Sequence, residues 1–100
     1  MTIEEFNEQV KTGLVIVKFS TTWCGPCKTV EATLDRIKQN VDGVEIVKID
    51  AEDEPELASH FRIRSVPVLM YYKDGELKDK SVGAVSEETI RKTIENVKNN

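Results

Sequence analysis

The sequence predicts an α/β protein of three layers, with helices on both faces of a central mixed sheet of about four strands. Helical and strand periodicities alternate along the chain in the order α-β-α-β-α-β-β-α. The first half contains a strand–helix–strand unit, and such a crossover joins parallel strands. The last two strands are separated only by Asp74-Gly75, a strong signal for an antiparallel hairpin. These observations predict four helices and a sheet that is parallel in its first half.

One domain is predicted over residues 1–100, because this length without a repeat or a flexible linker leaves no room for a second core. Fourteen basic and 18 acidic residues give a net charge of −4, which argues against nucleic-acid binding, since that requires clustered cations. The longest apolar runs are far shorter than the ~20 residues that span a bilayer, so we expect no membrane partner. The acidic start of the chain is unlike an export signal, and we expect a cytoplasmic protein.

The first helix is predicted to begin at Thr2, because Thr2 and Glu5 have the spacing of a capping box. Gly13 is suited to end this helix. A strand is predicted next over Leu14–Ser20, which is apolar up to Lys18, as expected for a strand covered on both faces. The buried stripe of the helix is expected at Ile3, Phe6 and Val10.

The second helix is predicted over Lys28–Gln39, with Pro26 suited to the first helical position. Its inward face follows from apolar spacings of three and four residues at Cys27, Val30, Leu34, Ile37 and Val41. Cys24 lies at or just before the first turn, whereas Cys27 lies on the inward face. The spacing therefore makes the two thiols unequal in exposure.

The remaining elements are predicted as a strand Val44–Ile49, a helix Pro55–Phe61, strands Val66–Lys73 and Glu76–Val82, and a last helix capped by Ser86. The segment Asp50–Glu56 contains five acidic residues. We interpret it as a solvated loop at a helix N-terminus rather than as a cation or partner site.

The only two cysteines stand together in Cys24-Gly25-Pro26-Cys27. A disulfide scaffold needs more bridges, and a structural zinc site needs four ligands, which His60, the single histidine, cannot complete. We expect His60 to be an exposed helical residue. A Cys-x-x-Cys pair in such a chain indicates redox chemistry, in which one thiolate attacks and a second thiol resolves the mixed disulfide. The helix N-terminus favours a thiolate at Cys24, so we predict that Cys24 attacks and Cys27 resolves.

The segment Trp23–Lys28 resembles the active-site signature of the thioredoxin family. The resemblance extends over residues 2–98 and includes further matches at Phe19, Ile63–Pro67, Lys73–Glu76, Val82–Ala84 and Ser86. It implies the thioredoxin fold, a cis Pro67 packed against the sulfurs, and a Val66 backbone that pairs with an extended substrate segment. It also implies an apolar docking surface around Cys24, formed by Trp23, Gly25, Pro26, Val66, Pro67, Gly83 and Ala84.

The resemblance implies a monomeric protein-disulfide reductase that is recharged by an electron donor of the thioredoxin reductase type. No cofactor or metal is expected, because the dithiol is itself the redox carrier. Two other classes stay open from the sequence: a binding module within a larger assembly, whose thiols are incidental, and a two-cysteine metal carrier. A more oxidising relative that forms or rearranges disulfides is a further alternative.

Three departures from the family pattern affect the expectations. Only Met1 and Thr2 precede the first predicted helix, so we expect the family's usual leading strand to be missing or vestigial and the strand Val44–Ile49 to lie at a sheet edge. Ala32 replaces a common proline, which predicts a straighter helix. Lys18 stands where the family usually carries a buried aspartate, and we expect its stem to lie on apolar neighbours with its charge in water. Two alternatives for Lys18 are a charge held near Cys27 that favours the thiolate, and a buried neutral lysine that acts as base.

Overall fold

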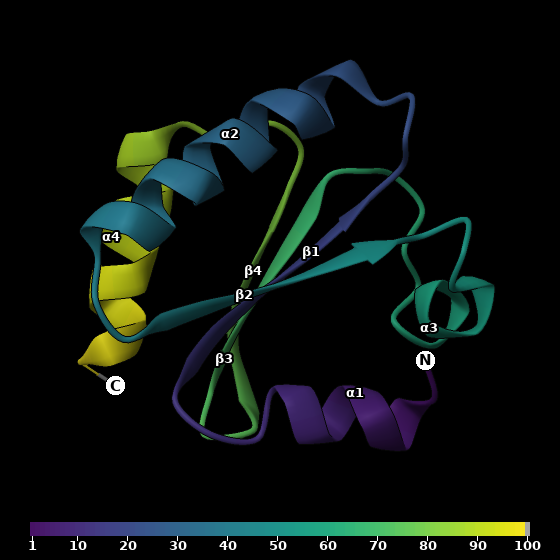
Figure 1. The fold of residues 1–100 in the computed structure, drawn as a ribbon, viewed down its shortest axis with the longest axis horizontal. Coiled ribbons are helices and arrows are strands. Elements are labelled where there is room, and N and C mark those ends of the chain that lie inside the picture. Colours follow the sequence, from purple (N-terminus) through teal and green to yellow (C-terminus); the bar gives the residue numbers. More distant parts are fainter. Residues whose placement is uncertain (100) are drawn as a thin grey trace.

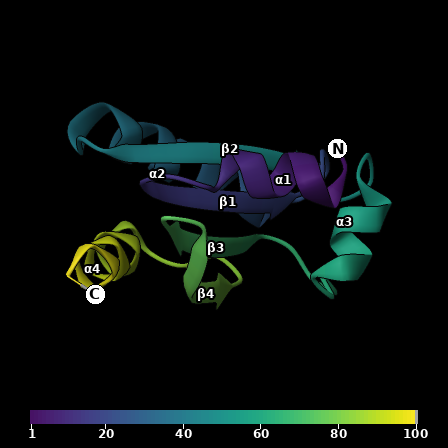
Figure 2. The same cartoon turned by 90° about the horizontal axis from the view of Figure 1, so that it is seen from below.

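The computed structural model describes residues 1–99, and its strands form one mixed sheet in the order β2-β1-β3-β4. Strand β1 pairs in parallel with β2 and antiparallel with β3, and β3 pairs antiparallel with β4. Figure 2 shows the four strands side by side, with β2 and β4 at the two edges. The strands span Leu14–Ser20 (β1), Val44–Asp50 (β2), Val68–Lys73 (β3) and Glu76–Val82 (β4).

Helices cover both faces of the sheet, so the predicted three-layer fold is confirmed (Figure 1). Helices α2 and α4 lie on one face, and α1 and α3 lie on the other. They span Ile3–Gln9 (α1), Gly25–Asn40 (α2), Pro55–His60 (α3) and Glu87–Lys98 (α4). Within the described residues, no helix is long and apolar enough to cross a membrane.

The core is divided by the sheet because successive residues of a strand point to opposite faces. In β1, Ile16 packs under α2 and α4, whereas Val15 and Val17 pack under α1 and α3. Helix α2 contributes Val30, Leu34 and Ile37 to the first face, all fully buried as the periodicity predicts. Lys18 follows the same alternation and therefore enters the layer beneath α2.

The capping signals at both ends of the chain are confirmed. Thr2 and Glu5 form the reciprocal hydrogen bonds of a capping box. The hydroxyl of Ser86 accepts a hydrogen bond from the Thr89 N–H at 3.1 Å. These side chains bind N–H groups that have no partner within their own helices.

Two predicted element starts are wrong by two or three residues, and both lie beside the cysteines. Strand β3 begins at Val68 and not at Val66. The Val66–Pro67 peptide bond is cis, and a proline has no N–H to donate to a ladder. Helix α2 begins at Gly25, three residues before the predicted start. Gly25 and Pro26 fit its first turn because N–H groups there need no helical acceptor.

Strand β2 lies at an edge of the sheet that the structure describes, as predicted. Lys38 covers one end of this edge, because its Nζ atom donates to the Val44 carbonyl at 2.8 Å and lies 3.0 Å from a carboxylate oxygen of Glu45. Charged side chains of this kind protect an edge against pairing with another chain.

Candidate functional site

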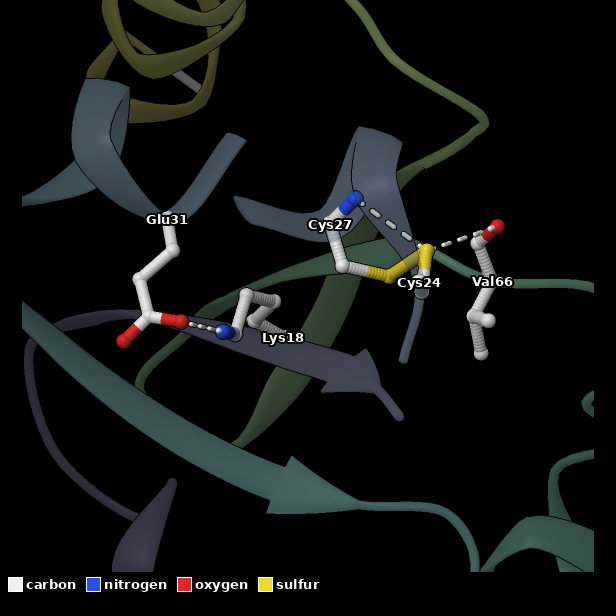
Figure 3. Close-up of a disulfide and its surroundings, with 5 residues drawn as sticks. All are labelled: Lys18, Cys24, Cys27, Glu31 and Val66. Carbon is white, nitrogen blue, oxygen red and sulfur yellow. Dashed lines mark hydrogen bonds and ion pairs between the residues drawn. A yellow bond between two sulfur atoms is a disulfide. The ribbon is translucent and has the colours of Figure 1, made fainter. Parts of the chain in front are cut away.

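A disulfide joins Cys24 and Cys27 at the N-terminus of α2 (Figure 3). Cys24 is the N-cap residue, and its Sγ atom accepts a hydrogen bond from the Cys27 N–H at 3.1 Å. The two Cα atoms are 5.2 Å apart, a separation that the first helical turn provides. This separation lies within the range that a disulfide requires.

The two sulfurs differ in access, as the helical spacing predicts. Cys24 is partly exposed, whereas only 2% of Cys27 is exposed. Helix α2 is 16 residues long, and its N-terminal N–H groups stabilise negative charge at Cys24. An incoming substrate can reach Cys24, and the shielded Cys27 lies directly beneath it.

The loop that contains the cis Val66–Pro67 bond lies next to Cys24. The Sγ atom of Cys24 is 3.9 Å from the carbonyl oxygen of Val66. The Gly83 N–H donates to the Pro67 carbonyl at 2.8 Å and so attaches the turn after β4 to this loop. Three segments that are distant in sequence, 21–28, 62–67 and 82–86, are therefore joined around the disulfide.

The predicted docking residues differ in exposure. Trp23 is 76% exposed, which is incompatible with a role in core packing. Gly25, Pro26 and Ala84 are also exposed, whereas Pro67 is buried. Val66 and Gly83 lie between these extremes. Among the predicted docking residues, Trp23, Gly25, Pro26 and Ala84 are therefore the most accessible.

Val82 was predicted at a strand end but was not included in the docking surface. It precedes Gly83 at the end of β4, and its side chain is 58% exposed. Its position at the end of a predicted strand, directly before Gly83, is the sequence signal that could have added it to the docking surface. Val82 adds an exposed apolar side chain directly before Gly83.

The predicted position of the Lys18 charge in water is wrong. The Lys18 side chain is only 3% exposed, and its Nζ atom lies 3.0 Å from Oε2 of Glu31. Figure 3 shows the ammonium directed toward Glu31 and away from the disulfide. Burial of a cation in so small a core requires a partner, and α2 supplies one.

Glu31 was not among the site residues predicted from the sequence. It follows Cys27 by four residues and therefore lies on the same side of α2, one turn further along. Its Oε1 atom also accepts a hydrogen bond from Lys48 on β2 at 3.1 Å. Hydrogen bonds from Lys18 and Lys48 hold the pKa of Glu31 below its ordinary value. The hydrogen bond to Glu31 in turn raises the pKa of Lys48.

The acidic segment Asp50–Glu56 forms hydrogen bonds within itself and an ion pair with the start of the chain. A side-chain oxygen of Asp50 accepts hydrogen bonds from the N–H groups of Glu52 and Asp53 at 2.8 and 3.3 Å. Glu54 pairs with the amino group of Met1. Within residues 1–99, no three His, Cys, Asp or Glu side chains are grouped to bind a metal ion. His60 is exposed, as predicted.

Comparison with known proteins gives consistent results along the chain. The sequence profile of the thioredoxin family matches residues 1–96. A thioredoxin of Staphylococcus haemolyticus is 35% identical over 96 residues, which are 95% of this chain and 92% of that protein. Thioredoxin 1 of Synechococcus elongatus is 43% identical over 82 residues, or 81% and 77% of the two chains. Mitochondrial thioredoxin 3 of Saccharomyces cerevisiae, in its oxidised form, superposes with a TM-score of 0.85 at 30% identity and covers 94% of this chain and 89% of its own.

Proposed function

Since this chain belongs to the thioredoxin family, we propose that it reduces disulfide bonds in proteins through Cys24 as the attacking thiolate and Cys27 as the resolving thiol. The chain is a dithiol–disulfide oxidoreductase, because family membership coincides with a cysteine pair joined at the start of a helix. The observation that supports the two roles is the difference in access between the partly exposed Cys24 and the buried Cys27.

The exchange takes place in two steps. The Cys24 thiolate attacks one sulfur of a substrate disulfide and releases the other sulfur as a thiolate. The Cys27 thiol then loses its proton and attacks Sγ of Cys24, which releases the second substrate thiol and forms the Cys24–Cys27 disulfide. Two electrons pass to the substrate. The second step is fast because both sulfurs belong to one helical turn and need no diffusional encounter.

An extended substrate segment docks on the surface formed by Trp23, Gly25, Pro26, Val66, Pro67, Gly83 and Ala84. The Val66 backbone offers polar groups for strand-like pairing beside the attacking sulfur. The 3.9 Å separation between the Val66 carbonyl and Sγ of Cys24 supports this placement. The exposed side chain of Trp23, the residue next to Cys24 in the chain, gives the substrate a further apolar contact.

Lys18 has a structural role and takes no direct part in the sulfur exchange. Its charge is neutralised by Glu31, so it is neither a free base nor an uncompensated cation for Cys27. Water removes the Cys27 proton. The Lys18→Met variant should therefore keep the pH profile of mixed-disulfide resolution, whereas a rise in the pH needed for half-maximal resolution would assign Lys18 a direct influence on the Cys27 thiolate.

The partners are protein substrates that carry disulfides and an electron donor of the thioredoxin reductase type. A reducing compartment suits such a protein, and we place it in the cytoplasm as a monomer.

Reduction of insulin coupled to a thioredoxin reductase and its nicotinamide reductant tests the function. Turnover that is lost in the Cys24→Ser variant supports the proposal. Formation of the Cys24–Cys27 disulfide without any turnover would instead indicate a binding module with incidental thiols.

A further inference from the structure

The backbone of Arg62 adopts a conformation that normally requires glycine. Its φ angle is +55°, in the left-handed region that L-residues disfavour. The Arg62 N–H donates to the Ser59 carbonyl at 3.1 Å, and the Ile63 N–H donates to the Ala58 carbonyl at 2.8 Å. This pair of bonds is the Schellman motif that ends α3, and glycine is the usual residue at the position of Arg62. An arginine in this conformation lowers the stability of the fold, which points to a function for its side chain.

The Arg62 side chain has no such use within the fold. It is exposed, and it forms no ion pair with any carboxylate among residues 1–99. The same holds for Arg64, two residues further along the chain. Both arginines belong to the short segment that leads directly to Val66-Pro67 and so to the carbonyl beside Cys24.

The three segments joined around the disulfide share one sign of charge. Segments 21–28, 62–67 and 82–86 contain Lys28, Arg62 and Arg64 and no acidic residue. Lys28 is also exposed and unpaired among the described residues. The whole chain has a net charge of −4. The acidic segment Asp50–Glu56 borders these loops, because the Ala51 N–H donates to the Ser20 carbonyl at 2.8 Å, so the cationic charge is confined to the three segments.

We propose that Arg62 and Arg64 form a cationic flank to the docking surface, which selects disulfides that are flanked by acidic residues. The inference rests on the proposed function and names the class of substrate that the same site prefers. Unpaired guanidinium groups attract carboxylates and can bind them with two parallel hydrogen bonds. Charge complementarity next to a reacting site raises the rate of productive encounter. The flank acts on the peptide chain beside the disulfide and takes no part in sulfur exchange.

Two synthetic peptides with the same disulfide-closed loop test the proposal, one flanked by Asp and Glu and the other by Lys at the same positions. The second-order rate constant for their reduction is measured with the reduced protein at low ionic strength. We expect the acidic peptide to react roughly 5- to 10-fold faster than the basic one. The ratio should approach one in about 0.5 M salt, where charges are screened within a few ångströms.

The Arg62→Gly/Arg64→Gln variant should lower this ratio at least about 3-fold at low ionic strength. The fold should tolerate glycine at position 62, because the backbone there already has glycine-like geometry. Lys11→Gln is the control, since it removes an exposed cation near the β3–β4 hairpin, at the end of the sheet away from the disulfide. It should leave the ratio unchanged.

Three results overturn the proposal. The first is a faster reaction of the basic peptide, which the net charge of the protein alone would give. The second is an unchanged rate ratio in the double variant. The third is an equal loss of the ratio in Lys11→Gln. In each of these the protein still reduces peptides, so the proposed function stands. Failure of the wild-type protein to reduce either peptide would instead contradict the proposed function itself.

Discussion

Removal of the Glu31 charge should lower the free energy of unfolding much more than removal of the Lys18 charge. Glu31→Gln leaves the Lys18 ammonium 3% exposed with no carboxylate, so we expect a clear loss of stability. Lys18→Met removes the buried charge and keeps a stem of similar length. Glu31 then retains Lys48 and, at 42% side-chain exposure, water as well. We expect this variant to be nearly as stable as the wild type.

The separation of the charges gives the size of the effect. At 3.0 Å and an effective dielectric constant near 20, the attraction is about 5–6 kcal/mol before solvation is counted. Water around the half-exposed Glu31 offsets much of this, and the glutamine oxygen still accepts a hydrogen bond from Lys18. We expect a loss of about 2 kcal/mol for Glu31→Gln and a change within about 1 kcal/mol for Lys18→Met.

Urea unfolding of the oxidised protein at pH 7 measures these values, with the slope against urea checked for constancy. The double variant Lys18→Met/Glu31→Gln is the decisive comparison. It should be close to Lys18→Met alone, because Glu31 has no buried cation left to neutralise. A larger loss for Lys18→Met than for Glu31→Gln, or additive losses in the double variant, would refute the buried pair as described.

Three further predictions concern acid stability, the first helix and the end of α3. The pKa of Glu31 is lowered by folding, so its contribution is complete above its ordinary value near 4.5 and is lost as the pH falls below it. The acid limb of stability against pH should therefore be flatter in Glu31→Gln, and equal limbs would contradict the lowered pKa. Thr2→Ala removes the capping box and should cost about 1 kcal/mol in urea unfolding, whereas no loss would show that the cap is dispensable. Arg62→Gly should raise stability by about 0.5–1 kcal/mol, since glycine accepts a positive φ, and a destabilised variant would reveal an unrecognised Arg62 contact.

Most of the fold could be predicted from the sequence because its signals are local. The spacing of Val30, Leu34 and Ile37 fixes the buried face of α2 whatever lies opposite. Asp74-Gly75 fixes the hairpin because few dipeptides accept a positive φ at both residues, and both adopt it here. The unequal exposure of the two cysteines follows from helical geometry alone.

No local pattern reveals the cis Val66–Pro67 bond, and only the family resemblance suggested it. The failed prediction for Lys18 depends on a contact between distant segments. The partner of Lys18 lies 13 residues away on α2, and its choice depends on how the helix crosses the sheet. An apolar pattern identifies buried residues but does not show that a lysine among them will find a carboxylate.

The difference in role between the two cysteines is the central claim, and capture of a mixed disulfide tests it most directly. Reduced Cys24→Ser and Cys27→Ser variants are incubated with a disulfide-containing protein and examined by mass spectrometry without reductant. The Cys27→Ser variant should accumulate a stable adduct through Cys24, because the resolving thiol is gone. The Cys24→Ser variant should form none at the buried Cys27. Equal adduct formation by both variants would contradict the assignment of attack to Cys24 and resolution to Cys27.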